Sequence, residues 1–288
     1  MGTYDDLDYR EPRKKVLIVG GSMVYHGAPI LSSLATLVSS PTAAVYTAVP
    51  RLNVDVTRRL LLNSVLMPLP GQQLTSKSFA HLLHVLLPAT PDVAAIGMGM
   101  GLSNLKALTD LVHELIGTRT KLVLDASALV PEILGTISQT GTIVTPHAGE
   151  YKRLFQQSAG TSMDEAQSNV HRLAKDYGIT IVWKGEINII SDGDKIAAIP
   201  RSTPAMTVGG TGDVLAGLIT GLLTRIESSE FNSSILAVYL NGLAATRAYR
   251  RKGLHMIATD LIAQLPRVLR DYDKRREAYQ RALMEQIL

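Results

Sequence analysis

The sequence predicts an α/β fold built on a parallel sheet with crossover helices. Short apolar runs of strand length alternate along the chain with segments whose apolar residues recur at helical spacing. The 288 residues, 46% of them hydrophobic, suffice for one large core, and no linker rich in proline, serine or glycine divides the chain. We therefore expect one catalytic domain at residues 16–270, a flexible polar tail at 1–15 and a charged helix at 271–288.

The first half of the chain shows the alternation most regularly. Gly20-Gly21-Ser22 follows the first expected strand, which places a glycine turn at the carboxyl edge of the sheet. Gly97, Gly99 and Gly101 follow the fourth strand and indicate close backbone approach, in a spacing that differs from the GxGxxG of dinucleotide folds. Ser103 is expected to cap the next helix. The strands are expected at 16–19, 44–49, 65–67 and 93–96, and the helices at 28–38, 54–62, 77–87 and 105–117.

The second half continues the pattern and includes a hairpin. Residues 235–245 are apolar nearly all round, which predicts a buried helix with Asn241 as its polar exception. A last helix starts near Asp260, and Pro266 is expected to bend or end it. The other elements are strands at 121–124, 142–145 and 179–183, a hairpin at 187–190 and 195–199, and helices from about 146–150, at 163–177 and after residue 212.

Gly209-Gly210-Thr211-Gly212-Asp213 is the strongest functional signal. It opens into apolar residues at helical spacing, so it predicts a turn into the amino terminus of a buried helix. Unpaired N–H groups and the helix dipole bind anions there, and glycines let a ligand approach the backbone. Asp213 beside such a cradle could take a proton from a hydroxyl while the N–H groups stabilise a phosphoryl group. The alternative is that Asp213 only caps the helix.

Four other polar residues lie at the ends of expected strands. Asp125 is either a site residue or a turn former. Glu150 could assist a magnesium ion through water; alternatively, it complements the helix dipole while His147 closes the turn. Lys184 could steady a nucleotide phosphate, and the glycine after it permits backbone contact with an adenosine, although this pair alone is a weak signal.

Composition excludes several classes of function. The net charge of +4 is mild for this length and forms no basic stripe with interleaved aromatics, so nucleic acid is not indicated. The absence of cysteine excludes disulfides, thiolate metal sites and a cysteine nucleophile. The first fifteen residues are polar rather than a signal sequence, and no apolar run approaches the roughly 18 residues needed to span a bilayer. We expect no membrane association and a cytoplasmic protein.

From residue 16 to 266 the chain resembles the NAD(P)H-hydrate dehydratases of the ribokinase-like superfamily. The GGTGD motif is shared with small-molecule kinases of that superfamily, whereas TPHAGE and the early GGS with its following GA are more particular to the dehydratases. The resemblance implies a ribokinase-like three-layer sandwich, with a mostly parallel central sheet and helices on both faces. It rests on GGS with GA at 27–28, the glycine cluster after residue 96, VLDASAL at 123–129, TPHAGE at 145–150, WKG at 183–185 and GGTGDVLAG at 209–217.

The resemblance also implies a reaction. ADP or ATP would phosphorylate the hydroxyl of hydrated NADH or NADPH, as the S epimer, and phosphate would then leave to restore the dihydronicotinamide. Asp213 would be the base, the amides of Gly210, Thr211 and Gly212 would form the anion hole, and Glu150 would help place Mg²⁺, through water. The hydrated dinucleotide would contact Ala28, Gly99, Gly101, His147 and Asp213, and the nucleotide would contact Lys184, Gly185, Glu186, Ile187, Asn188, Gly212 and Asn241.

The chain departs from the family pattern at several positions. Ala148 stands where proline is usual, and methionines interrupt the glycine cluster where proline and leucine are frequent. Ser127 replaces an aspartate, which leaves Asp125 alone. Glu186-Ile187-Asn188 replaces a small residue and threonine, so nucleotide contacts from that loop are expected to differ. The epimerase domain fused in many bacterial relatives is not found in the sequence, so we expect a separate epimerase or spontaneous epimerisation.

Two other classes of function stay open at this level. A kinase acting on a thiazole or pyridine alcohol would use the same GGTGD chemistry but leave phosphate on its product. A non-catalytic nucleotide-binding module would not need Asp213. The residues do not decide between ADP and ATP, and the single-domain form favours ADP by analogy with the family. The same analogy favours a homotetramer, for which the apolar stripe Leu283, Met284, Ile287 and Leu288 could serve as a contact.

Overall fold

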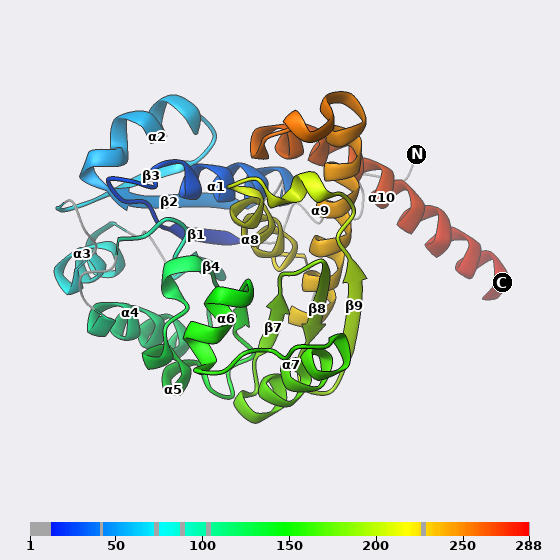
Figure 1. Cartoon of the computed structure of the whole chain (residues 1–288). Helices are drawn as coiled ribbons and strands as arrows, with labels where there is room; N and C mark the ends of the chain where they lie inside the picture. The colour runs from blue at the N-terminus through cyan, green and yellow to red at the C-terminus, as the bar shows by residue number, and fades with distance from the viewer. Residues whose placement is uncertain are drawn as a thin grey trace.

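The computed structural model describes residues 13–40, 43–71, 75–86, 90–101, 105–225 and 229–287. The strands in these ranges form one sheet in the order β3-β2-β1-β4-β5-β6-β7-β8-β9 (Figure 1). Neighbouring strands are parallel from β3 to β7, and β8 and β9 are added antiparallel. The strands are β1 (Lys15–Val19), β2 (Ala44–Pro50), β3 (Val65–Leu69), β4 (Val93–Ile96), β5 (Lys121–Leu124), β6 (Ile143–Val144), β7 (Thr180–Trp183), β8 (Ile187–Ser191) and β9 (Ile196–Pro200).

Helices cover both faces of the sheet. One core lies between the sheet and α3 to α7, and the other lies between the sheet and α1, α8, α9 and α10 (Figure 1). This confirms the α/β sandwich with a mostly parallel central sheet. The helices are α1 (Gly27–Ser39), α2 (Val54–Leu60), α3 (Ser76–His81), α4 (Leu105–Gly117), α5 (Leu134–Ile137), α6 (Ala148–Phe155), α7 (Met163–Tyr177), α8 (Thr211–Leu222), α9 (Glu230–Lys252) and α10 (Ala258–Ile287).

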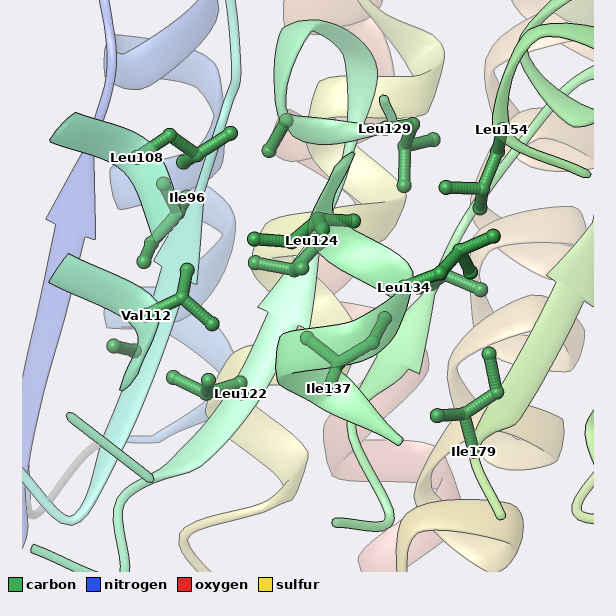
Figure 2. Packing of buried hydrophobic residues seen from close by; sticks show 14 of the residues in the cluster. Ile96, Leu108, Val112, Leu122, Leu124, Leu129, Leu134, Ile137, Leu154 and Ile179 are labelled. Atoms are coloured by element: carbon green, nitrogen blue, oxygen red, sulfur yellow. The ribbon is translucent and has the colours of Figure 1, made fainter. Parts of the chain in front are cut away.

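Successive residues of the central strands enter opposite cores. In β1, Leu17 and Val19 face the core under α3 to α7, whereas Val16 and Ile18 face the core under α8 to α10. Figure 2 shows the first of these cores, where Ile96 and Leu124 of the sheet meet Leu108 of α4 and Leu134 of α5. A strand buried on both faces must be apolar throughout, which explains the unbroken apolar runs in the sequence.

Small residues bring α1 and α8 close together. A Cβ added at Gly217 would overlap the backbone of Ser32, and one added at Gly221 would overlap the side chain of Ser39. The hydroxyl of Thr36 donates to the carbonyl oxygen of Gly217 at 2.9 Å, and that of Ser32 donates to the carbonyl oxygen of Asp213 at 2.8 Å. This packing and these bonds hold the first turn of α8 against α1.

Several sequence predictions need correction in their boundaries. The helix expected at 77–87 ends as α3 at His81 and continues as a π turn at Leu82–Leu86. The strand expected at 142–145 is only the two-residue β6. The helix expected at 163–177 is confirmed as α7, with the Ser162 hydroxyl accepting from the N–H of Glu165. The predicted cap at Ser103 and residues 1–12 of the tail expected at 1–15 lie outside the described residues, and Lys15 at the end of that expected tail belongs to β1.

The predicted burial of residues 235–245 is wrong for one face. The helix that contains them, α9, runs for 23 residues, and its Leu240 and Asn241 are buried. Tyr239 and Leu243 are 46% and 36% exposed. An outer-layer helix turns only part of its surface toward the sheet, so an all-round apolar sequence overestimates its burial.

The last helix also differs from the expectation. It runs through Pro266 as one helix of 30 residues, so Pro266 does not end it. Asp271 forms an ion pair with Arg247 at 2.7 Å, and Asp273 forms one with Arg225 at 3.0 Å. The first turn beyond residue 270 is therefore held against the rest of the domain. Beyond that turn α10 extends away from the sheet (Figure 1). The side chains of the expected apolar stripe at 283–288 lie outside the described set.

Candidate active site

The carboxyl ends of five adjacent strands bring the polar and glycine signals of the sequence to one edge. Gly20 follows β1, Gly97 follows β4, Asp125 follows β5, Thr145 follows β6 and Lys184 follows β7. Parallel strands finish at the same edge of a sheet, where ligands of open α/β folds bind. The candidate active site lies along this edge.

A buried cluster of charges occupies the centre of the edge. The Lys184 ammonium donates to Asp125 Oδ1 at 2.8 Å and lies 3.6 Å from Glu150 Oε2, with the Lys184 and Asp125 side chains 19% and 3% exposed. The Thr145 hydroxyl donates to the same Asp125 oxygen at 2.7 Å. Burial alone would lower the pKa of Lys184, but the carboxylates of Asp125 and Glu150 outweigh it, so the pKa is raised and the ammonium stays charged.

The first turn of α8 faces this cluster with unpaired backbone donors. Gly210 is the N-cap residue in a left-handed conformation with φ of +94°, and its carbonyl oxygen accepts the first helical bond from Val214. Helix geometry then leaves the N–H groups of residues 211–213 without helical partners. The Thr211 hydroxyl donates to the carbonyl oxygens of Met206 and Val208 at 2.9 and 3.1 Å, so it holds the preceding loop. The turn can therefore bind an anion through its backbone N–H groups rather than through the Thr211 hydroxyl.

Asp213 is the third residue of α8 and makes no side-chain cap bond there, so the capping alternative is wrong. The pKa of Asp213 is raised to about 7, mainly by burial and also by the negative charges of Asp125 and Glu150, while Lys184 lowers it. A carboxylate with this pKa exchanges a proton near neutral pH, as a general base requires. The arrangement can therefore take a proton from a hydroxyl beside a turn that binds anions.

His147 and Glu150 form a capping box at the start of α6. His147 Nδ1 accepts from the N–H groups of Gly149 and Glu150 at 3.0 and 3.3 Å, and Glu150 Oε2 accepts from the N–H of His147 at 2.9 Å. His147 closes the turn and Glu150 lies in the first turn of α6, as the structural alternative for this pair predicts, while a role of Glu150 in placing magnesium stays a prediction. The box also holds the Glu150 carboxylate near Lys184. Lys184 forms a β-bridge with His147, the N-cap residue of the box, and its Nζ lies 3.6 Å from Glu150 Oε2.

The donor chemistry of the cluster fits a magnesium ion that keeps most of its water. Glu150 supplies a carboxylate oxygen, the ligand type that magnesium prefers, at the edge of the cluster. Within the part of the chain that the structure describes, no three histidine, aspartate or glutamate side chains gather as a metal-binding group. Such an ion would therefore depend on water and on nucleotide phosphates for most of its ligands.

The glycines after β4 pack against the chain itself. Gly99 has φ of +63°, and a Cβ there would lie 2.6 Å from the carbonyl oxygen of Tyr25 and 2.9 Å from the Cβ of Ala28. A Cβ on Gly101 would lie 3.3 Å from that of Ser22. Three of the residues expected to contact the hydrated dinucleotide, Ala28, Gly99 and Gly101, are thereby brought together around the loop before α1.

The predicted nucleotide segment connects β7 to β8. The Asn188 amide donates to the carbonyl oxygen of Ile199 at 3.2 Å, so its side chain is used by the hairpin. The carbonyl oxygen of Glu186 accepts from the N–H of Arg201 at 2.7 Å. A Cβ built on Gly212 would lie 3.3 Å from Lys184 Nζ, so these two predicted nucleotide-binding residues lie next to each other. Asn241 is buried on α9, and its side-chain oxygen has no described hydrogen-bond partner.

Sequence reasoning missed two residues that hold the site. Thr145 supports Asp125 from the neighbouring strand, and the signal was available, because a hydroxyl follows β6 at the position where an aspartate follows β5. Ser32 supports the first turn of α8 through the carbonyl oxygen of Asp213. No local sequence signal identifies Ser32, since its role depends on how α1 crosses α8.

Comparison with known proteins places this geometry among its relatives. Residues 16–267 match the family described as NAD(P)H-hydrate dehydratase. The chain is 46% identical over 269 residues to the ADP-dependent (S)-NAD(P)H-hydrate dehydratase of Cenarchaeum symbiosum, covering 92% of this chain and 93% of that one. Its fold is similar to that of the ADP/ATP-dependent NAD(P)H-hydrate dehydratase of Bacillus subtilis co-crystallised with ATP and Mg²⁺ and soaked with CoA, with a TM-score of 0.76, 22% identity and coverage of 91% and 93%. A ribokinase-like superfamily protein of Enterococcus faecalis matches with a TM-score of 0.72, 23% identity and coverage of 90% and 87%.

Proposed function

Because the chain belongs to the NAD(P)H-hydrate dehydratase family, we propose that it catalyses the ADP-dependent dehydration of hydrated NADH and NADPH. The substrate is the S epimer, in keeping with the name of the archaeal relative. The single observation that carries the proposal is Asp213, a half-buried carboxylate with a pKa of about 7, next to the unpaired N–H groups that begin α8. A base and an anion cradle side by side are what phosphorylation of an alcohol requires.

The first step is phosphoryl transfer to the ring hydroxyl of the substrate. Asp213 takes the hydroxyl proton while the oxygen attacks the terminal phosphorus of the nucleotide, and AMP or ADP leaves with the bridging oxygen. The N–H groups of residues 210–212 stabilise the charge that develops on the phosphoryl oxygens.

The second step is elimination of phosphate. The nitrogen lone pair of the reduced ring expels the phosphate by breaking the carbon–oxygen bond, and loss of a neighbouring ring proton restores the double bond. Phosphorylation matters because phosphate is a far better leaving group than hydroxide. The ring nitrogen supplies the electrons, so the chain needs no second acid for this step.

Magnesium and the nucleotide complete the proposed reaction. Glu150 would help to hold Mg²⁺ through water, and the ion when bound would neutralise charge on the nucleotide phosphates. Lys184 and residues 185–188 would hold the nucleotide together with Gly212 and Asn241, while Ala28, Gly99, Gly101 and His147 would contact the hydrated dinucleotide. The name of the archaeal relative favours ADP as the donor.

The wider setting is also part of the proposal. We expect the enzyme to act in the cytoplasm, as a homo-oligomer, with a separate epimerase converting the other epimer of the hydrate. In the described part of the chain, no helix is long and apolar enough to cross a membrane.

The test is to incubate the purified protein with hydrated NADH, magnesium and either ADP or ATP. Recovery of the dihydronicotinamide absorbance with an equal release of phosphate is the expected result, and it identifies the donor. Stable phosphorylated substrate with no recovery would instead indicate a kinase. A folded protein that binds nucleotide and gives neither result would exclude the proposed function.

A further inference from the structure

The ion pair between Asp125 and Lys184 lies beside the open first turn of α8. Lys184 Nζ donates to Asp125 Oδ1 at 2.8 Å, and a Cβ on Gly212 would lie 3.3 Å from the same nitrogen. The ammonium therefore binds a carboxylate at the end of β5 and lies close to a helix terminus of the kind that binds anions. A positive charge at this place meets the phosphoryl group that the helix terminus holds.

Asp125 itself faces protein rather than ligand. Its side chain is almost fully buried, its Oδ1 also accepts from the Thr145 hydroxyl at 2.7 Å, and its N–H donates to the carbonyl oxygen of Ile96 at 3.1 Å. A carboxylate would also repel a phosphate. An effect of Asp125 on a phosphoryl group therefore passes through a neighbouring charged group, and Lys184 is the one that Asp125 binds directly.

We propose that Asp125, held by Thr145, is a positioning residue that keeps the Lys184 ammonium at the amino end of α8, on the phosphoryl group in transfer. This inference rests on the proposed function and assigns Lys184 to the transferred phosphate. Lys184 stays protonated throughout and exchanges no proton. A charge placed against the transferring group acts most strongly in the transition state, so kcat should depend on Asp125 more than nucleotide affinity does.

Ser127, two residues further along the DASAL segment, takes no part in this ion pair. Ser127, where an aspartate is common in the family, donates its N–H to the carbonyl oxygen of Gly97 at 3.3 Å and contacts neither Lys184 nor Thr145 in any described hydrogen bond. Of positions 125 and 127, it is position 125 that directly follows β5 and binds the Lys184 ammonium.

The first experiment compares Thr145→Val with Thr145→Ser, because neither changes the charge of the site. Thr145→Val removes the donor that fixes Asp125 and should lower kcat about tenfold, with the KM for ADP within about twofold. Thr145→Ser keeps the hydroxyl and should keep kcat within about twofold of the wild type. Asp125→Asn should lower kcat about 10- to 100-fold, and adding it to Lys184→Met should cause no further loss.

A second readout does not depend on turnover. Affinity for inorganic phosphate, followed by the fluorescence of Trp183, the single tryptophan, should fall about fivefold in Thr145→Val and in Asp125→Asn. Removing a negative charge without a positioning effect would instead raise phosphate affinity, so an increase in Asp125→Asn overturns the inference. Thermal melting shows that each variant is folded.

The two proposals fail in different ways. If the wild type turns over hydrated NADH but all Thr145 and Asp125 variants match it in kcat and phosphate affinity, the positioning role is wrong and the dehydratase stands. If the wild type shows no turnover but phosphate binding follows the expected pattern, the proposed function fails and the placement of Lys184 stands. Loss of ADP affinity with unchanged kcat would make the pair a nucleotide anchor and contradict the inference.

Discussion

Two glycine turns at the same sheet edge look alike in sequence and are used in opposite ways. In the first turn, Gly97 and Gly99 leave no room for a Cβ, which would overlap the Asp125 backbone in one case and lie 2.6 Å from the Tyr25 carbonyl oxygen in the other. In the second turn, a Cβ on Gly209 meets nothing within 4 Å, and one on Gly212 meets only Lys184 Nζ. The first turn is filled by its own chain, and the second is open toward the site.

The difference shows that a glycine cluster indicates close approach of other atoms to the backbone, but it does not indicate whether those atoms belong to the chain itself or to a ligand. Packing of the chain on itself explains the first turn, whose residues Gly97 and Gly99 also have positive φ. In the second turn only Gly210 is demanded by the fold, with positive φ and a Cβ that would lie 2.7 Å from Leu31 and 2.9 Å from Ala258. Changes at Gly97 should therefore affect stability, and changes at Gly209 and Asp213 should affect chemistry.

The largest effect is expected for Asp213→Asn, which changes the open turn without altering its shape. Turnover should fall by about 10²- to 10⁴-fold because the base is lost. The raised pKa means that the ionised carboxylate of Asp213 disfavours the folded state, so the contribution of this group to stability is greatest at low pH and falls as pH rises from about 4 toward 7. The variant should therefore melt at or above the wild-type temperature at pH 8. Lower stability with retained turnover would contradict the contrast between the turns.

Gly97→Ala should cause the largest loss of stability. The added methyl overlaps the Asp125 backbone and the residue keeps φ of +118°, so the free energy of unfolding should fall by about 3–5 kcal/mol. Denaturant unfolding measures this loss. The activity of the variant should be proportional to the fraction of it that remains folded. A variant as stable as the wild type would show that this turn is not filled as described.

The pH dependence of turnover sharpens the chemical side of the comparison. Asp213 must be ionised to accept a proton, and its pKa is about 7, so kcat/KM should fall about tenfold for each pH unit below 7 and level off above it. A pH series with a constant nucleotide concentration measures the profile. Asp213→Asn, at its residual rate, should lose this dependence, and a wild-type profile flat from pH 5 to 8 would argue against Asp213 as the base.

The smallest effect is expected for Gly209→Ala, the mild counterpart of Gly97→Ala. Nothing in the fold occupies the space of the new methyl, so the free energy of unfolding should stay within about 0.5 kcal/mol. The methyl enters the space open to a ligand, and turnover should fall about fivefold. Unchanged turnover at unchanged stability would show that the ligand does not approach this part of the turn.

Much of the fold could be predicted from local patterns. Strands buried on both faces are apolar throughout, so β1, β4, β5 and β7 stand out as runs such as Val16 to Val19. Boundaries were less predictable. The helical pattern continues past His81, where the α-helix gives way to a π turn, and α10 continues through Pro266, where a bend or an end was expected. The burial of α9 was overestimated, since sequence does not say which side of an outer helix faces the sheet.

The site was predicted in its parts but not in its connections. Asp213 and the glycines before it follow from the chemistry of a helix amino terminus, which is a local property of the backbone. The contact of Lys184 with Asp125 joins residues 59 positions apart, and that of Thr145 with Asp125 joins residues 20 apart. Both exist because the parallel strands β5, β6 and β7 end together at one edge of the sheet.

The sequence alone determined the order of strands and helices, the anion-binding turn and the position of the base, because each depends on a short stretch of chain. Only the tertiary structure decided which glycines serve packing and which face a ligand, since a missing Cβ looks the same in both cases. It also decided that Asp213 has a pKa of about 7, because burial and the charges of Asp125, Glu150 and Lys184 arrive from other strands and helices. Electrostatics depends on distance in space, and the fold sets that distance.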